Sequence, residues 1–321
     1  MGTSNTNIDE IKAINPKEVC GIKIFMGAST GNLLVDNEDS LNNLFKESPV
    51  IITTHCEDTP MIKDLEEKYL DKYGSKIPVE MHADIRSREC CLKSSKKAVE
   101  LAEKHQANLH ILHITTKDEI SLFSNKPLNE KLITAEVCVP HLYFSKDDYE
   151  DKGTLIKCNP SIKEMSDREA LRKALLEGYI DYVATDHAPH LLEGKSNDYM
   201  ECPSGMPSVQ HTLLVLLELV REGVYSLKDL PYYLSHKVAD RFKIIDRGYI
   251  REGYWADLVL VDLDSPQSVS RENVSYFCGW SPFEGDTFNS KVVSTFVNGN
   301  LVYNEGKIIE SGRGVQLEFD R

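Results

Sequence analysis

The sequence predicts an α/β protein in which parallel strands alternate with helices, followed by a small antiparallel β-module. Five short runs rich in Val and Ile, separated by amphipathic segments, indicate strand–helix units and a parallel sheet buried on both faces. After residue 245 the sequence becomes turn-rich and carries only short strand patterns. We therefore expect an α/β body over residues 1–245 and a β-module over residues 246–321.

The five apolar runs are the expected strands of the body, at residues 19–25, 49–55, 109–114, 132–139 and 179–185. The segments between them have helical spacing at residues 41–46, 59–73, 89–105, 117–123 and 166–177. Two further helices are expected over residues 207–222 and 226–243, before a strand at residues 256–263. A hairpin at residues 294–304 contains Asn298-Gly299, which is typical of a type I′ turn.

Composition excludes several classes of protein. The 321 residues carry a net charge of −14 without any cluster of Lys and Arg, so we expect no nucleic-acid or anionic-membrane partner. No apolar run approaches the ~18 residues of a membrane span, and no export signal is visible. The eight cysteines form no CxxC pair, and most of them, such as Cys20 and Cys138, lie in apolar stretches. Buried reduced thiols and a cytoplasmic location are expected.

Residues that can bind a metal or move a proton lie in or at the end of four expected strands: Lys23, His55, His113 and Asp186. In a barrel of parallel strands such groups converge on one mouth. Taken singly, Lys23 is better explained as a lysine at a sheet edge, and each histidine as a hydrogen-bonded loop residue. For Asp186, a turn-forming or helix-capping role is as good an explanation as a functional one. Their recurrence at equivalent points of successive units favours a shared site. His110 competes with His113, but strand alternation puts the two on opposite sides.

The string TDHAPH places Asp186, His187 and His190 within one short loop stiffened by proline. A carboxylate at a strand end can ligate a metal and take a proton from water, as metal-assisted hydrolysis requires. His190 can then face a substrate. For His187 we favour a loop histidine that hydrogen-bonds to backbone.

Seven motifs together resemble the amidohydrolase superfamily, and within it the dihydroorotases of the bacterial type that is similar to hydantoinases and allantoinases. They are GIKIFMGASTGNLLVD, THCED, HILHIT, KCNPSIK, ATDHAPH, CPSGMP and GYIREGYWADLVLVDLD. The resemblance implies a TIM-type (β/α)8 barrel, here with strands equivalent to 4–8, and part of a small β-sandwich. It also implies a metal-dependent hydrolase that opens dihydroorotate to N-carbamoyl-aspartate in pyrimidine synthesis.

The resemblance also implies roles for single residues. Lys23 matches the lysine that is carboxylated and bridges two zinc ions, and His55 and His113 match the histidines of the second metal site. Asp186 matches the aspartate that ligates the first metal and shuttles the proton. Substrate-binding positions are matched by Asn159, His190, Ser204 and Gly205. A plain turn leading into a helix is the alternative for the loop at Ser204 and Gly205.

The HxH motif that opens the family's barrel, and the arginine that follows it, are missing. No two of the ten histidines are separated by one residue, and five body strands are expected rather than eight. We therefore expect that about the first quarter of the family's chain is absent, that two sheet edges are open and favour self-association, and that at most one metal is held. We also expect this chain alone to have little or no hydrolase activity.

Three alternatives stay open at this point. Allantoinase and dihydropyrimidinase share the lysine, histidine and aspartate positions, although Asn159 and His190 favour a substrate with a carboxylate. A non-catalytic homologue could serve as a binding or scaffold subunit. The mixed nitrogen and oxygen donor set also permits Mn, Fe or Co in place of zinc.

Overall fold

The computed structural model describes residues 1–27, 33–310 and 314–321. Five parallel strands form one sheet in the order of the sequence, β1-β2-β3-β4-β5. They are β1 (Ile22–Phe25), β2 (Ile52–His55), β3 (Leu109–Ile111), β4 (Ile133–Cys138) and β5 (Tyr182–Ala184). The predicted α/β class and the five predicted strands are confirmed, each strand being shorter than its apolar run.

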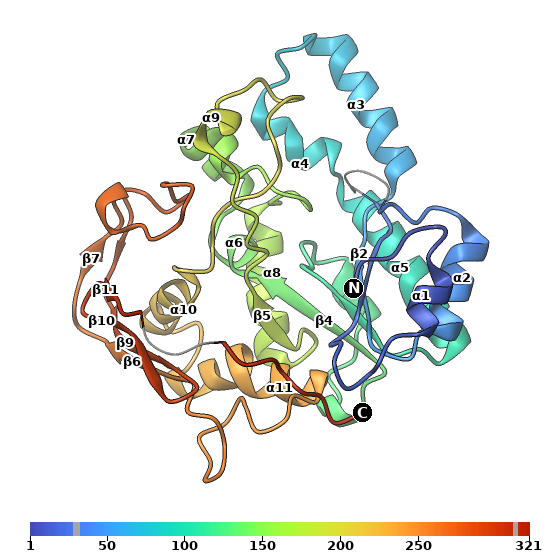
Figure 1. Ribbon diagram of the computed structural model, residues 1–321. Helices are drawn as coiled ribbons and strands as arrows, with labels where there is room; N and C mark the ends of the chain where they lie inside the picture. The colour runs from blue at the N-terminus through green and yellow to red at the C-terminus, as the bar shows by residue number, and fades with distance from the viewer. Residues whose placement is uncertain (28–32, 311–313) are drawn as a thin grey trace.

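Helices connect the strands and lie around the outside of the sheet, with α2 and α5 beside β2 and α10 beyond β5 (Figure 1). The α-helices are α1 (Ile8–Lys12), α2 (Glu38–Glu47), α3 (Thr59–Tyr73), α4 (His82–Ile85), α5 (Arg88–His105), α6 (Val139–Tyr143), α7 (Tyr149–Lys152), α8 (Met165–Glu177), α9 (Leu192–Lys195), α10 (Thr212–Arg221) and α11 (Lys237–Phe242). The side chains of Asn37, Asp58 and Ser87 cap α2, α3 and α5, because each accepts a hydrogen bond from a first-turn backbone N–H.

Two predicted helices take another form. Residues 117–123 contain only the 3₁₀ turn Glu119–Leu122, because the Glu119 carboxylate accepts hydrogen bonds from Thr116 and Ser95 instead of extending into solvent. Residues 226–243 are broken at Pro231, which has no N–H to continue a helix. They comprise a 3₁₀ turn (Leu227–Asp229), a π-helix (Tyr232–His236) and α11.

The register of the sheet separates an apolar from a polar face. Ile22 and Ile24 of β1 are fully buried, whereas Lys23 between them faces the other side. Lys23 is in register with Thr53, and Phe25 with His55. The side chains of Thr53 and His55 on β2 therefore lie on the same face of the sheet as Lys23. The polar face therefore carries Lys23 and His55, two of the predicted site residues.

The outer edge of β1 is paired, so our expectation of two open edges was wrong there. Lys23 N donates to Met1 O and Thr3 N donates to Lys23 O, while Val35 N donates to Phe25 O. The first residues of the chain and the segment before α2 thus satisfy backbone groups that would otherwise be open to another strand. Among the described residues, β5 forms a ladder with β4 alone. Self-association through that edge stays a prediction.

The C-terminal module contains a four-stranded antiparallel sheet in the order β11-β10-β9-β6, at the side of the body in Figure 1. Its strands are β6 (Leu258–Asp262), β9 (Lys291–Val297), β10 (Asn300–Asn304) and β11 (Lys307–Ile308); β7 (Gln267–Ser268) pairs with β8 (Thr287–Phe288). Asn298 and Gly299 have φ of +52° and +80°, which fits the predicted type I′ turn. Phe319 N returns to the body and donates to Lys17 O. The boundary at residue 245 stays a prediction.

All eight cysteines are free thiols. Cys138 is buried as expected, whereas Cys20, which lies before β1, is exposed. Among the described residues, no helix combines the length and the apolar composition that a bilayer crossing requires.

Candidate functional site

Lys23 lies on β1, the first strand of the sheet, and Asp186 follows β5, the last strand, by two residues, yet their charges affect each other. Burial lowers the pKa of Lys23, and the negative charges of Asp186 and Glu136 oppose this shift. Asp186 is exposed, but the protein atoms around its carboxylate displace water and raise its pKa. The positive charges of His55 and Lys23 oppose this rise. The two residues are therefore near enough for their charges to interact across a common space, and their roles as metal ligands stay predictions.

His55 and His113 contact each other within reach of the charges of Lys23 and Asp186. His55 is the last residue of β2, and His113 follows β3 by two residues. Nδ1 of His55 lies 3.0 Å from Nε2 of His113, and both side chains are buried. Burial lowers the pKa of His113 well below its usual value, and the neighbouring charges of His55 and Lys23 lower it further.

The backbone is strained where the chain leaves two of the strands. His113 and Asp186 have φ of +39° and +44°, in the left-handed region that a residue other than glycine rarely adopts. Such a conformation costs on the order of 1–3 kcal/mol and is concentrated at functional sites.

Glu57 and Arg86 are site residues that we did not predict. Oε2 of Glu57 lies 2.7 Å from Nε2 of His55 and 2.7 Å from a guanidinium nitrogen of Arg86. Burial raises the pKa of Glu57, but Arg86 and His55 outweigh burial and lower the pKa to about 2. The motif THCED already placed this carboxylate two residues beyond His55; nothing in the sequence connected it with Arg86.

The predicted substrate-binding residues form a second group. Nε2 of His190 lies 3.2 Å from Ser204 O, and Gly205 N donates to Lys157 O at 2.9 Å. Oδ1 of Asn159 is buried without a hydrogen-bond partner among the described residues. Charge on Asp186 raises the pKa of Cys158 in addition to the larger effect of burial, which connects this group with the first.

Two buried lysines, also missed from the sequence, hold the loop around Ser204. Lys195 Nζ donates to the carbonyls of Lys157, Pro203 and Gly205 at 3.1, 2.9 and 3.0 Å. Lys157 Nζ donates to two further carbonyls of the same loop, each at 2.6 Å. Burial lowers the pKa of each lysine to about 8.

The two histidines that we set aside have structural partners. His110 contacts Thr134, Glu136 and the Tyr182 hydroxyl at 2.8–3.0 Å and is fully buried. His187 accepts a hydrogen bond from Ser208 N at 3.0 Å, as expected of a loop histidine. Residues 28–32, which belong to the GIKIFMGASTGNLLVD motif, lie outside the described residues.

The donors of the first group fit a divalent cation. Two nitrogens that bind one tetrahedral zinc ion at ~2.0–2.1 Å lie roughly 3.3 Å apart, so the observed 3.0 Å requires only a small outward movement. Nδ1 of His113 is buried and unpartnered among the described residues. A neutral ring protonated there would present the Nε2 lone pair to a cation shared with His55.

Glu57, Cys90 and Cys91 form another buried group of ligand atoms, within 4.8 Å of one another. The Arg86 guanidinium donates a hydrogen bond to the Glu57 carboxylate, and Lys163 Nζ lies 4.0 Å from Cys91 Sγ, so two cations already lie against this group. The hydrogen bond to Cys90, together with burial, raises the pKa of the Cys91 thiol well above its usual value. We assign no metal to this group.

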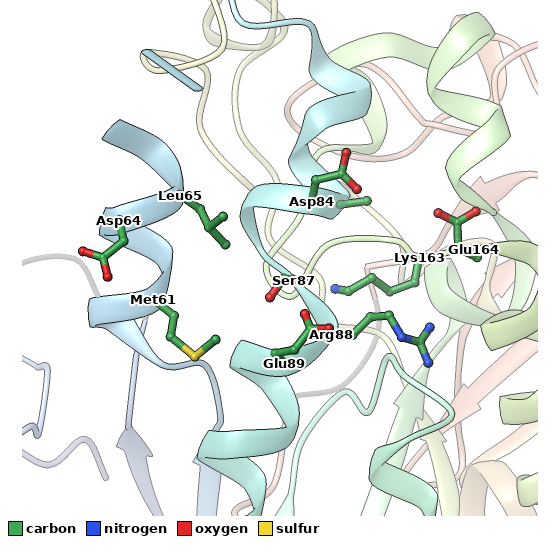
Figure 2. Close-up of a pocket in the computed structure, with 10 residues that line it drawn as sticks. Met61, Asp64, Leu65, Asp84, Ser87, Arg88, Glu89, Lys163 and Glu164 are labelled. Carbon is green, nitrogen blue, oxygen red and sulfur yellow. The ribbon is translucent and has the colours of Figure 1, made fainter. Parts of the chain in front are cut away.

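Figure 2 shows a separate cavity of about 520 Å³ between α3, the start of α5 and the segment that precedes α8. Met61 and Leu65 give it an apolar wall, and Arg88, Glu89 and Lys163 add charges of both signs. None of the eight predicted site residues lines it. This cavity is thus not the site built on the strand ends.

Fold and site together define an α/β protein with candidate metal ligands at the ends of parallel strands. The chain belongs to the amidohydrolase family, whose sequence profile matches residues 37–302. Dihydroorotases from Pyrococcus horikoshii and Halobacterium salinarum are each 31% identical to it, over 299 and 266 residues. These matches cover 92% and 82% of this chain but 63% and 60% of the relatives, so the chain spans less than two thirds of their length.

A solved dihydropyrimidinase from Brevibacillus agri has the same fold, with a TM-score of 0.86 at 22% identity. The match covers 96% of this chain and 69% of that one. The five-stranded sheet and the antiparallel module are therefore a partial barrel and part of a sandwich, as the sequence motifs predicted.

Proposed function

We propose that the chain is a metal-dependent hydrolase of cyclic amides, with dihydroorotate as the substrate that water opens to N-carbamoyl-aspartate in pyrimidine synthesis. The observation that carries the proposal is the pair of imidazole nitrogens 3.0 Å apart, within reach of the charges of Lys23 and Asp186. The relatives named dihydroorotase support the choice of substrate.

Lys23, His55 and His113, the predicted ligands of the second metal site, would hold the cation, for which zinc is our choice, and Asp186 would belong to the first metal site. A divalent cation there would polarise the amide carbonyl and lower the pKa of water. Burial lowers the pKa of Lys23, and this favours the neutral amine that can add CO₂. The resulting carbamate would replace a costly buried ammonium with an anionic oxygen ligand.

The remaining chemistry falls to the chain's own side chains. A carboxylate of Asp186 would accept a proton from the attacking water and return it to the ring nitrogen that leaves. Asn159, whose Oδ1 has no partner among the described residues, would hydrogen-bond to the ring. His190 and the backbone of Ser204 and Gly205 would bind the end that carries the carboxylate.

We propose a single cation and low turnover for the 321-residue chain, because its sequence contains no HxH pair. Calorimetric titration with Zn²⁺ tests this: we expect one ion per chain, lost in His113→Ala. The control is His105→Ala. Among the described residues the His105 side chain, at the end of α5, hydrogen-bonds to Asn42, far from the predicted ligands in sequence, so the variant should bind Zn²⁺ as the wild type does. Two tightly bound ions together with ordinary turnover of dihydroorotate would contradict the proposal.

Substrate choice is tested by adding dihydroorotate, dihydrouracil and allantoin to the zinc-loaded chain and following ring opening by loss of ultraviolet absorbance. Dihydroorotate should react fastest, with a rate that falls in Asn159→Ala. Faster opening of allantoin or dihydrouracil would overturn our choice. Tight binding of dihydroorotate without any opening would instead identify a binding subunit.

A further inference from the structure

Glu57 lies between a candidate metal ligand and a buried cation. Its Oε2 is 2.7 Å from Nε2 of His55 and equally far from a guanidinium nitrogen of Arg86. The Glu57 side chain is fully buried and that of Arg86 is 13% exposed. Because Arg86 cannot give up its proton, the ionised carboxylate can only accept. The proton of this contact must therefore lie on Nε2 of His55.

A proton fixed on Nε2 determines what His55 presents on its other side. Neutral imidazole carries one proton, so Nδ1 is left with a free lone pair. That nitrogen faces Nε2 of His113 at 3.0 Å. The contact with Glu57 thus sets both the tautomer and the orientation of the ring.

We propose that Glu57, held by Arg86, is a positioning residue that fixes the proton of His55 on Nε2 and so directs the Nδ1 lone pair into the cation site. The inference rests on the proposed function and adds two residues to its machinery. Carboxylates that hold a ligand histidine in this way raise its basicity, and their loss costs 10–100-fold in metal affinity.

The local sequence keeps Glu57 in place. His55 ends β2, and Asp58 caps α3, so only Cys56 and Glu57 connect the strand with the helix. A Cβ on Gly27 would lie 2.0 Å from Glu57 O, which means that only glycine allows the end of β1 to approach this connection. Backbone on both sides therefore restricts the carboxylate to the space beside His55.

The tautomer can be measured without any metal. Nuclear magnetic resonance of protein labelled with ¹⁵N-histidine, by two-bond ¹H–¹⁵N correlation, distinguishes a protonated Nε2 from a protonated Nδ1. We expect a fixed Nε2–H on His55 in the wild type and in Glu57→Gln, which keeps an acceptor, and exchange between tautomers in Glu57→Leu. A wild-type His55 protonated on Nδ1, or averaging between tautomers, overturns the proposal.

Metal affinity provides the second measurement, by titration with Co²⁺ and its visible absorbance. We expect affinity to fall 10–100-fold in Glu57→Leu and less in Glu57→Gln. Glu119→Gln is the matched control, since Glu119 is another buried carboxylate but bonds to hydroxyls. The double variant Glu57→Leu/Arg86→Met is measured alongside, because Glu57→Leu alone leaves a buried guanidinium unpaired.

The two measurements separate this inference from the proposed function. Unchanged Co²⁺ affinity in both leucine variants overturns the positioning role while the cation site stands. A wild type that binds no Co²⁺ but keeps a fixed Nε2–H overturns the cation site and supports control of the tautomer by Glu57.

Discussion

Lys195 offers the sharpest test of how the candidate substrate loop is held. Its side chain is 1% exposed, and its three donors reach the carbonyls of Lys157, Pro203 and Gly205. We expect Lys195→Met, which keeps most of the volume and removes every donor, to destabilise the protein and loosen this loop.

The size of the effect follows from the carbonyls left behind. Lys157 O keeps a hydrogen bond from Gly205 N, so two carbonyls lose their principal donor. At ~1–3 kcal/mol for each unsatisfied buried group, the loss is about 2–6 kcal/mol. Removing a buried ammonium, which burial penalises, offsets part of this loss. A net destabilisation of about 2–4 kcal/mol is expected.

Urea denaturation measures the free energy of unfolding, and hydrogen exchange measures protection of the Gly205 amide. Lys173→Met is the control, because Lys173 is exposed on α8 and pairs only with Glu177 at 3.6 Å among the described residues. We expect the control to stay within ~0.5 kcal/mol of the wild type. A Lys195→Met protein that matches the control in stability and in Gly205 protection would refute the reasoning.

Three further changes have defined outcomes. Gly205→Ala should destabilise by more than Gly223→Ala when both are compared by thermal melting, because a Cβ on Gly205 would lie 2.7 Å from another side chain, whereas Gly223 has open space. Burial lowers the pKa of His211 to about 4, so the unfolded chain binds the extra proton first and stability is lost as pH falls from 6.5 to 4. His211→Phe should remove up to about 3 kcal/mol of this loss, as acid titration of the denaturation midpoint would reveal. Asp181→Asn breaks a buried pair with Lys131 at 2.7 Å and should cost about 3–5 kcal/mol in urea denaturation, while Asp181→Leu/Lys131→Met costs less.

Local patterns were enough to predict the body of the fold. The Val- and Ile-rich runs marked all five strands, and Asn298-Gly299 marked the hairpin turn. The pattern failed where contacts distant in sequence decided the outcome. Pairing of Met1 and Thr3 with the edge of β1 leaves no periodicity to detect, because backbone groups and the single hydroxyl of Thr3 make the contact.

The same division applies to the candidate site. His55 and His113 could be chosen as candidates because one ends an apolar strand and the other follows one, and parallel strands bring their ends together. Lys195 and Arg86 could not be found, because a lysine or arginine in a charged segment is expected to be exposed. Only the tertiary structure shows that both are buried. The family resemblance implied no role for Glu57, although this residue lies within the THCED motif.

The placement of Lys23 and Asp186 shows what kind of sheet these five strands form. If the sheet were flat, four strand spacings of ~4.8 Å would put β1 and β5 about 19 Å apart. The charge of Asp186, two residues beyond β5, nevertheless acts on the pKa of Lys23, which fits a sheet curved as part of a barrel. His55 and His113, on adjacent strands, need no such curvature and depend only on the pairing of β2 with β3. Changes that flatten the sheet should therefore separate Lys23 from Asp186 while the two histidines keep their contact.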